Sequence, residues 1–447
     1  MKLIIKIYVL NAIVTSVFFA SCQIKTTPIV ITPEDYYLTT DKVTEIMIHD
    51  IFSPPVASRI LSYPNVAAYE IIAGYNNKYN SLSDQLHELT HIPAFDSTKG
   101  NLNPQLAALI AHMEVSKGLI FSEDKIIELR DSLYNVWEKT NKSEFKIARE
   151  YGLEVAEHIK SWMNKDNYKQ TRSMPKYTVT SDDPSRWQPT PPAYMDAVEP
   201  HWAKIRPFVI DSASQFKPTP PLKFSLDKKS DFYKELIEVY TIGNKTIENG
   251  DASEEIKISQ FWDCNPYVSV SSGHLMFATK KITPGAHWMG IVKIAARKTN
   301  SNFDDTIFAC TKTSLAIADA FISCWDEKYR SNLIRPETLI NQYIDENWKP
   351  ILQTPPFPEY PSGHSVVSGA AATALTDIFG DNFKFDDDTE IPYGLPVRSF
   401  NSFNEAAAEA AISRMYGGIH FRTAIEVGVK QGRNLGNFIN EKLKMKK

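Results

Sequence analysis

The stretch "PEYPSGHSVVSGAAATAL" (residues 358–375) decides the fold of this chain. Ser362, Gly363 and His364 stand where a helix is about to begin, and most of the later positions are small. The N-terminus of a helix favours an anion, because its free backbone N–H groups and its dipole both point there. Small side chains let neighbouring helices pack closely. We therefore expect a core helix over 362–379 that opens on a polar site.

The composition of the whole chain is typical of a globular protein. It has 447 residues, of which 43% are hydrophobic and 23% are charged, so it is long enough for two or three domains or one large helical body. The formal net charge is −4. Nucleic acid is therefore not expected as a partner, because neutralising its phosphates needs a cationic surface.

The first 22 residues are expected to be a signal peptide. Lys2 and Lys6 precede an apolar run over 7–19, which is shorter than the ~20 residues that span a membrane. Small residues before Cys22 resemble the lipobox of bacterial lipoproteins, in which the cysteine is lipidated; an ordinary secretory signal is the alternative. We expect an exported chain, anchored through Cys22 to a bacterial envelope membrane (periplasm or outer membrane) and tethered by residues 23–40.

Helical periodicity dominates the rest of the chain, and we expect an all-α protein. The best candidate for a strand is the short "KYTVT" at 176–180. The expected helices lie at 43–52, 65–75, 104–121, 143–163, 230–243, 254–263, 285–299, 305–330 and 362–379, with two more after Ser402.

Two helical bundles are expected, joined by a proline-rich segment. Residues 175–221 hold ten of the 27 prolines, but Trp187 and Trp202 interrupt them, and a disordered linker would lack such aromatic residues. We expect this segment to be ordered and wrapped over the helices. The expected division is 23–174 for an N-terminal helical region, 175–225 for the connecting segment and 226–447 for a second helical domain that carries the site.

Three blocks in the C-terminal part share one chemical theme. Lys328 is followed by Arg335, then comes the 362–364 block, and Arg414 is followed by His420. Arginine donates two parallel N–H groups to an oxyanion, lysine supplies a compact charge, and glycine lets the backbone come close. One histidine can then bind or attack the central atom while the other moves a proton. The pattern predicts a site for a tetrahedral or trigonal oxyanion.

With these blocks in place, the chain resembles the superfamily of vanadium-dependent haloperoxidases and type 2 phosphatidic acid phosphatases. The strict motif match covers about residues 325–424. A looser similarity to bacterial lipoproteins of the haloperoxidase type extends over most of the chain, through "RWQPTPPAY", "FWD", "TPGAHW" and "TPPFPEYPSGH".

The resemblance implies a role for each matching residue. It implies that the vanadate or phosphate oxygens are held by Lys328, Arg335, Ser362, Gly363 and Arg414. His420 would coordinate vanadium, or become phosphorylated in a phosphatase, and His364 would be the general acid and base. Trp325 and Phe357 match an indole and a phenyl ring that stand beside vanadate in chloride-oxidising members; ordinary core packing is the alternative.

One position departs from the family pattern. The family has an aspartate four residues after the last histidine, where this chain has Ala424. Such a carboxylate orients the imidazole and raises its basicity. A backbone carbonyl is the expected substitute acceptor for the ring N–H. The loss puts high activity in doubt, more for a phosphatase than for a protein that holds vanadate.

The expected function is that of a vanadate-dependent haloperoxidase-like enzyme, with hydrogen peroxide and a halide as substrates and vanadate as cofactor. The first alternative is a secreted acid phosphatase that hydrolyses phosphomonoesters through phosphorylated His420 and needs no cofactor. The second alternative is a non-catalytic surface lipoprotein that binds an oxyanion. The oligomeric state is not predicted.

Several other features are expected to be structural. His287 and Trp288 are expected to pack in an aromatic corner, and His274 is treated as structural. Residues 381–401 form a long polar loop, a candidate lid, in which the acidic run at 385–390 is expected to be solvated. Three cysteines cannot all pair, so buried thiols are expected at Cys264, Cys310 and Cys324. A smooth, closely packed helix face is expected at Gly428, Gly432 and Gly436.

Overall fold

The computed structural model describes residues 27–447, apart from 181, 251, 266–268, 273–274 and 279–280. Cys22 and His274 therefore lie outside the described residues. Among the rest, helices dominate, and the all-α prediction is confirmed. The helices are α2 (Pro33–His49), α3 (Pro54–Tyr75), α4 (Pro104–Lys117), α5 (Glu123–Thr140), α6 (Lys142–Met163), α7 (Tyr168–Thr171), α8 (Asp231–Glu248), α9 (Glu254–Phe261), α10 (Pro284–Lys298), α11 (Phe303–Ser331), α12 (Pro336–Tyr343), α13 (Gly363–Phe379), α14 (Phe403–Tyr416) and α15 (Arg422–Lys442), with short 3-10 turns η1 (Ser97–Lys99), η2 (Trp202–Lys204) and η3 (Ile391–Tyr393).

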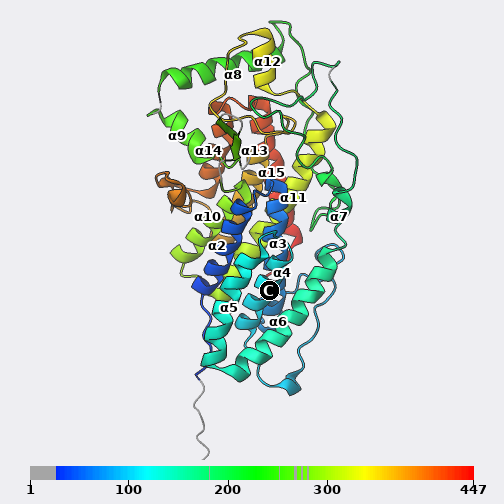
Figure 1. Cartoon of the computed structure of the whole chain (residues 1–447), viewed down its shortest axis with the longest axis vertical. Coiled ribbons are helices and arrows are strands. Elements are labelled where there is room, and N and C mark those ends of the chain that lie inside the picture. Colours follow the sequence, from blue (N-terminus) through cyan, green and yellow to red (C-terminus); the bar gives the residue numbers. More distant parts are fainter. Residues whose placement is uncertain (1–26, 181, 251, 266–268, 273–274, 279–280) are drawn as a thin grey trace, which may run out of the picture.

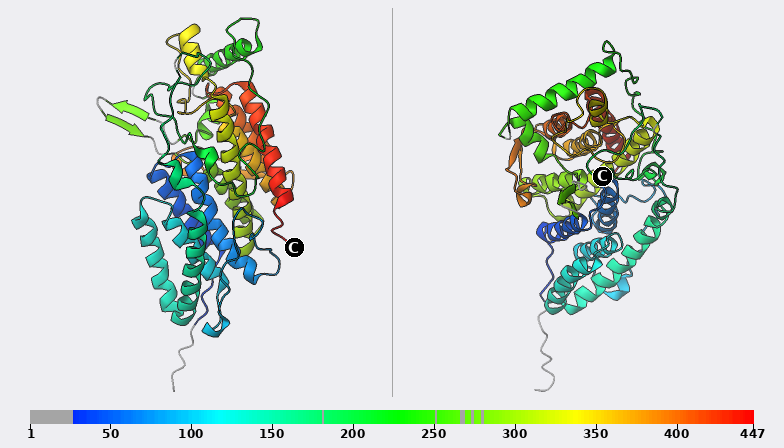
Figure 2. Two further views of the ribbon diagram at one scale, coloured as in Figure 1. Left: turned by 90° about the vertical axis from the view of Figure 1, so that its right-hand side faces the viewer. Right: turned by 45° about the horizontal axis from the view of Figure 1, so that its top comes forward.

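Strands are few and short. Ser269–Ser272 (β1) pairs antiparallel with Leu275–Ala278 (β2), and this hairpin projects from the body of the molecule (Figure 2). Phe385–Asp387 (β3) pairs antiparallel with Arg398–Phe400 (β4). The strand expected at 176–180 does not form; the described part of that segment has no regular structure, since it follows the surface without a neighbouring strand to pair with.

The helices pack into an elongated body with α5 and α6 toward one end and α8 and α12 at the other (Figure 1). Helix α3 packs on α4, and α4 packs on α6; at the other side α13 packs on α11, α14 and α15. Contacts between α11 and α3 join the two groups, and one hydrophobic core runs through both. The boundaries expected at 174 and 225 stay a prediction.

Helix α2 begins earlier than expected, so the tether predicted over 23–40 is wrong in its second half. Pro33 occupies the first turn, and Thr32 and Asp35 form a capping box before it. A proline at the start, a capping box and acidic residues in the first turn all stabilise a helix N-terminus. Tyr36 and Tyr37 are buried and fix the helix to the core.

The closest helix–helix approach supports the site from behind. A Cβ at Gly432 of α15 would lie 2.0 Å from the Val366 carbonyl oxygen of α13, and a Cβ at Gly369 would lie 2.7 Å from the Val429 carbonyl oxygen. Real Cβ contacts are never that short, so glycine is required on both helices. The small-residue pattern of the sequence predicts close helix packing, and these contacts confirm it.

Helix α11 is the central helix of the molecule. It is the one described helix that is long and apolar enough to cross a membrane, but its apolar window is completely buried inside the protein, as in the core helix of a folded domain. Cys310 and Cys324 lie on it as free, buried thiols, and Cys264 is free and buried as well, as expected.

The proline-rich segment is an ordered strap over α11, as predicted. Its own residues Trp187 and Trp202 are buried. The Asp319 carboxylate, in the middle of α11, accepts backbone N–H groups from Phe208 (2.7 Å), Val209 (2.7 Å) and Ile210 (3.0 Å). A buried carboxylate with three such partners holds the strap firmly in place.

Candidate active site

The three sequence blocks meet around one small cavity. Lys328 comes from the last turn of α11, Arg335 caps α12, Gly363 begins α13, Arg414 lies near the end of α14, and His420 precedes α15. The cavity has a volume of about 30 Å³, more than the ~10–15 Å³ that one water needs. Six of the predicted residues line it: Trp325, Phe357, Gly363, His364, Arg414 and His420. We call Lys328, Arg335, Arg414, His364 and His420 the oxyanion cage.

Cavity size alone would have pointed elsewhere. A cavity of about 620 Å³ lies between α2, α3 and α10, but none of the three blocks lines it. The small cavity is the candidate site because Arg414 and both predicted histidines line it, and Arg335 contacts one of them, His420, from outside the lining.

Lys328 stands behind the cavity wall. Its ammonium donates to the backbone carbonyls of Pro358 (2.9 Å), Glu359 (3.0 Å) and Pro361 (2.6 Å), all in the stretch before α13. Its Nζ also lies 4.9 Å from the ring centroid of Phe357. Burial lowers the pKa of Lys328 to about 7, because the charged form loses its hydration.

Both guanidinium groups are fixed by backbone carbonyls. Arg335 donates to Phe357 through Nε (2.8 Å) and to Ile419 through Nη1 (2.9 Å). Arg414 donates to the Trp262 carbonyl (2.7 Å). Burial lowers the pKa of Arg335 to about 10 and also lowers that of Arg414. Each cation is thus oriented before any ligand arrives.

His420 is held as a neutral ring with a defined tautomer. Its Nδ1 lies 2.8 Å from Glu359 Oε1 and donates to that carboxylate, while Nε2 accepts from Arg335 Nη1 at 3.2 Å. Burial lowers the pKa of His420 well below its usual range, and Arg335 lowers it further. Nε2 is therefore the ring nitrogen without a proton, and its lone pair, which here accepts from Arg335, is the one that a central atom such as vanadium would take.

Glu359 replaces the aspartate that the family has at position 424. Its Oε1 accepts from both His420 Nδ1 and the Phe421 N–H (2.9 Å). The backbone carbonyl expected for this task is thus not used; the carbonyl of Ala424 accepts instead from Ser362 N–H (3.1 Å). Burial raises the pKa of Glu359 to about 7, although Arg335 opposes this. Glu359, from another segment, thus orients the His420 ring although position 424 is an alanine.

His364 points an unoccupied nitrogen into the site. Its Nε2 is buried and has no hydrogen-bond partner among the described residues. Burial lowers the pKa of His364 well below its usual range, the Arg414 guanidinium lowers it further, and a hydrogen bond to the Trp262 backbone acts in the opposite direction. A neutral imidazole with a free nitrogen is able to take up or return a proton.

The 362–364 block is built as predicted at a helix start. Ser362 is the N-cap of α13, and its hydroxyl accepts from Ser365 N–H at 3.4 Å. A Cβ at Gly363 would lie 3.5 Å from the Trp325 ring and 3.9 Å from Lys328 Cε, which are ordinary contacts. Packing alone does not require this glycine, and its missing side chain leaves space beside the cavity.

Trp325 and Phe357 flank the cage with their rings 5.0 Å apart. The Trp325 indole N–H donates to the Val198 carbonyl of the strap at 3.2 Å. That N–H is therefore engaged in a backbone contact. The two rings are buried in the core and also line the cavity. The expected role beside vanadate and the alternative of core packing are therefore compatible.

The residues present fit a bound oxyanion such as vanadate. Lys328, Arg335 and Arg414 are each at most 1% exposed, and none of them forms an ion pair with a carboxylate in the described part of the chain. Buried charge without a counter-ion is costly, so the cage favours an anion. The free His364 Nε2 and the space at Gly363 lie on the same cavity.

The acidic run 385–390 is not simply solvated, which corrects that expectation. Asp387 is fully buried, and its Oδ2 lies 2.9 Å from His287 Nε2. His287 and Trp288 are buried as well, as expected for an aromatic corner, and the His287 ring stacks on Trp262 at 4.5 Å. The candidate lid is partly ordered by the β3–β4 pair.

Comparisons with known proteins agree with this site. A family model described as the VCPO second helical-bundle domain matches residues 308–446. No curated protein sequence gives a significant match. Among solved structures, the chain is similar to a bacterial vanadium-dependent iodoperoxidase at 69% identity, with a TM-score of 0.91, covering 94% of this chain and 99% of that one.

Two further solved structures share the fold. They are holo and apo forms of a bacterial vanadium-dependent chloroperoxidase, at 16% and 17% identity, with TM-scores of 0.63 and 0.65. They cover 90% and 95% of this chain, and the matches span 92% and 96% of theirs. The cage geometry, the family model and the 69% identical relative together establish the family: this chain belongs to the vanadium-dependent haloperoxidases, a family of enzymes.

Proposed function

We propose that this enzyme oxidises iodide with hydrogen peroxide, using vanadate held in the oxyanion cage. The observation that carries the proposal is the 69% identity, over 94% of this chain, to a bacterial vanadium-dependent iodoperoxidase. The balanced reaction is iodide, hydrogen peroxide and one proton giving hypoiodous acid and water. A proton must therefore reach an oxygen of the site in every turnover.

The cage residues divide the work among them. Bound vanadate supplies the centre at which hydrogen peroxide is activated toward halide. His420 Nε2 holds it, since Nδ1 is committed to Glu359. Arg335, Arg414 and Lys328 withdraw negative charge from the oxygens, which is the electrostatic term that dominates such catalysis. His364 moves the proton through its free Nε2.

The aromatic side of the cavity favours iodide over chloride as the substrate. Chloride is the hardest of the common halides to oxidise and iodide is the easiest. The Trp325 N–H donates to the Val198 carbonyl and is not free to bind a halide. With that donor engaged, selectivity rests on how readily each halide is oxidised, which is greatest for iodide.

Phosphomonoester hydrolysis and non-catalytic anion binding are not favoured. Both alternatives use the same cage, so each one predicts a distinct result when vanadate-loaded protein is assayed. A phosphatase would hydrolyse p-nitrophenyl phosphate, and vanadate would inhibit this hydrolysis. A non-catalytic binding protein would take up vanadate but show neither halide oxidation nor phosphate ester hydrolysis.

The test is a halide series on the full chain after vanadate loading. We expect iodide oxidation, followed as triiodide, to be faster than bromide and chloride oxidation, and to disappear in His420→Ala. The matched control is His112→Leu, because His112 is a buried histidine outside the cage. Chloride turnover as fast as iodide turnover would contradict the halide assignment, and p-nitrophenyl phosphate hydrolysis without iodide oxidation would replace the proposal by the phosphatase.

We also propose that the chain is exported and anchored through a lipid on Cys22. The support is the sequence alone, in which a lysine-flanked apolar run is followed by small residues before the cysteine. Labelling with a radioactive fatty acid in a bacterial host is expected to mark the wild type and not Cys22→Ala. Secretion of unlabelled wild type into the medium would leave only an ordinary signal peptide.

A further inference from the structure

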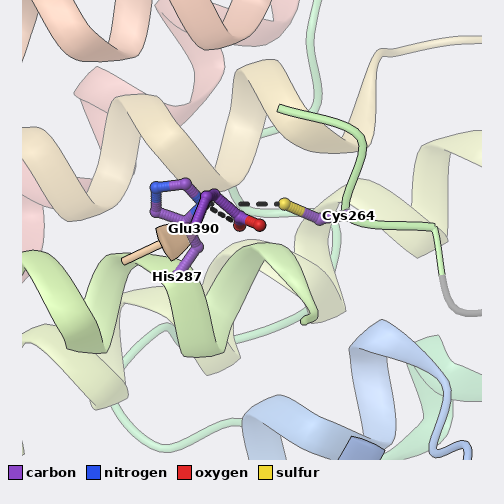
Figure 3. Close-up of side chains that lie close together, drawn as sticks. All are labelled: Cys264, His287 and Glu390. Carbon is purple, nitrogen blue, oxygen red and sulfur yellow. Dashed lines mark hydrogen bonds and ion pairs between the residues drawn. The ribbon is translucent and has the colours of Figure 1, made fainter. Parts of the chain in front are cut away.

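A second buried cluster lies next to the oxyanion cage. Figure 3 shows Cys264 after α9, His287 on α10 and Glu390 before η3. One potential ligand atom from each side chain lies within 4.8 Å of the other two. All three residues are at most 5% exposed. We call these three residues the thiol cluster.

The hydrogen bonds around His287 define which ring nitrogen carries the proton. Nε2 lies 2.9 Å from Asp387 Oδ2 and 2.9 Å from the Thr389 hydroxyl. The Thr389 hydroxyl donates its own proton to Asp387 Oδ1 at 2.6 Å, so it accepts from the ring. Nε2 therefore carries a ring proton, and Nδ1 is the nitrogen that faces Glu390, where it holds either a second proton or a cation. A carboxylate on the far nitrogen is the usual partner of a metal-binding histidine.

His287 Nδ1 faces two further potential ligand atoms. Glu390 Oε1 lies 3.0 Å from it and Cys264 Sγ lies 3.8 Å from it. Glu390 Oε1 has no hydrogen-bond donor among the described residues. A ring nitrogen and a carboxylate oxygen 3.0 Å apart and shielded from water need a positive species between them, and a proton or a metal ion can supply it.

We propose that Cys264 Sγ, His287 Nδ1 and Glu390 Oε1 bind a divalent metal ion of the zinc class. Sulfur, imidazole nitrogen and carboxylate oxygen are the ligands that zinc takes in proteins. A tetrahedral ion with Zn–S of ~2.3 Å and Zn–N of ~2.0 Å sets sulfur and nitrogen about 3.5 Å apart. The 3.8 Å separation of Sγ and Nδ1 needs only a small adjustment.

This metal ties three segments together beside the cage. Its ligands come from α10, from the β3–η3 connection and from the segment after α9. Trp262 lies between the two clusters: its ring stacks on His287, and its carbonyl accepts from Arg414 at 2.7 Å. The proposed role is to position this wall of the cage. Cys264 also lines the cavity of the oxyanion cage, but the zinc proposal does not depend on the proposed halide chemistry.

The experiment counts zinc in the full chain, purified without a histidine tag or chelator from zinc-supplemented cells. We expect about one zinc per chain in the wild type, as for a structural site, and near-complete loss in Cys264→Ser and Glu390→Gln. The matched control Cys310→Ser changes a buried thiol outside the cluster and keeps the zinc. His420→Ala also keeps zinc while losing vanadate, which separates this proposal from the function of the cage.

Two further measurements keep the test decisive if a ligand variant does not fold. The cobalt-loaded wild type is expected to show a thiolate-to-cobalt charge-transfer band, which needs no variant at all. Asp387→Asn, which leaves all three ligands in place, is expected to weaken zinc binding ~10–100-fold. Wild-type protein that binds neither zinc nor cobalt, or a zinc content unchanged in Cys264→Ser and Glu390→Gln, overturns the proposal and leaves a proton between His287 and Glu390.

Discussion

The oxyanion cage and the thiol cluster are neighbouring buried clusters with opposite electrostatic needs. Lys328, Arg335 and Arg414 donate to backbone carbonyls, and no carboxylate in the described part of the chain forms an ion pair with them. His287 instead sits between the carboxylates of Asp387 and Glu390. The cage needs an anion and the cluster needs a cation. The contrast teaches that unbalanced charge, and not the volume of a cavity, indicates what a buried site binds.

The largest expected effect tests the cluster side of this contrast. In His287→Leu, two buried carboxylates lose the group between them, and breaking such a buried pair costs about 3–5 kcal/mol. His112→Leu is the matched change, because burial lowers the pKa of His112 to about 3 and keeps the ring neutral; it is expected to cost less than ~1.5 kcal/mol. Free energies of unfolding in urea measure both. Equal losses of unfolding free energy in the two variants would show that His287 is no more important to its carboxylate neighbours than His112 is to the apolar core.

The next effect tests the cage side. Arg414→Ala removes a fixed cation from the cavity, and losing one such donor lowers kcat ~10²–10³-fold. Arg398→Ala serves as control, since Arg398 pairs with Glu254 and Glu409 outside the cage. Iodide oxidation by vanadate-loaded protein is the measurement. A loss of the same size in both variants would mean that general destabilisation, not the cage charge, is responsible.

A smaller effect tests how His420 is oriented. Glu359→Ala removes the acceptor of His420 Nδ1–H and is expected to weaken vanadate binding ~10–100-fold. Glu359→Gln is expected to lose less, because an amide oxygen still accepts from the ring and from Phe421 N–H. Equilibrium dialysis against vanadate gives both affinities. Unchanged binding in Glu359→Ala would show that the ring needs no carboxylate.

The smallest effect is a pH dependence of vanadate affinity. The pKa of Lys328 is about 7 in the anion-free protein. Below that pH the ammonium is already charged, whereas above it binding must first take up a proton, so affinity falls as pH rises through about 7. Lys328→Met is expected to lack this component. The ratio of wild-type to variant Kd cancels the ionisation of vanadate itself, and a ratio independent of pH would contradict the assignment.

Much of the fold was predictable because its signals are local. Helical periodicity gave the all-α class, and the small residues around Gly369 and Gly432 predicted close helix packing, which the α13–α15 contact confirms. The start of α2 was missed although Thr32, Pro33 and Asp35 form a recognisable start signal. The first turns of α2 carry consecutive large residues followed by two threonines (36–40, "YYLTT"), which show no clear helical period.

The candidate site was predictable only where it follows a linear motif. Gly363, His364, Arg414 and His420 line one cavity, whereas Lys328, Arg335 and Ser362 lie outside its lining. Glu359 was missed because it reaches His420 across 61 residues of sequence, and the family pattern directs attention to position 424. The link between His287 and Asp387 spans 100 residues, and no spacing rule connects them. Partners brought together only by tertiary packing leave no periodic trace in the sequence.

The three amides on Asp319 have a consequence for synthesis of the chain. Phe208, Val209 and Ile210 leave the ribosome 111, 110 and 109 residues before their common acceptor. At ~5–20 residues per second, they wait roughly 5–20 s with only water to bond to. A nascent chain that stops before α11 lacks the carboxylate that binds the strap. The strap therefore reaches its native position only after the second half of the chain has been synthesised.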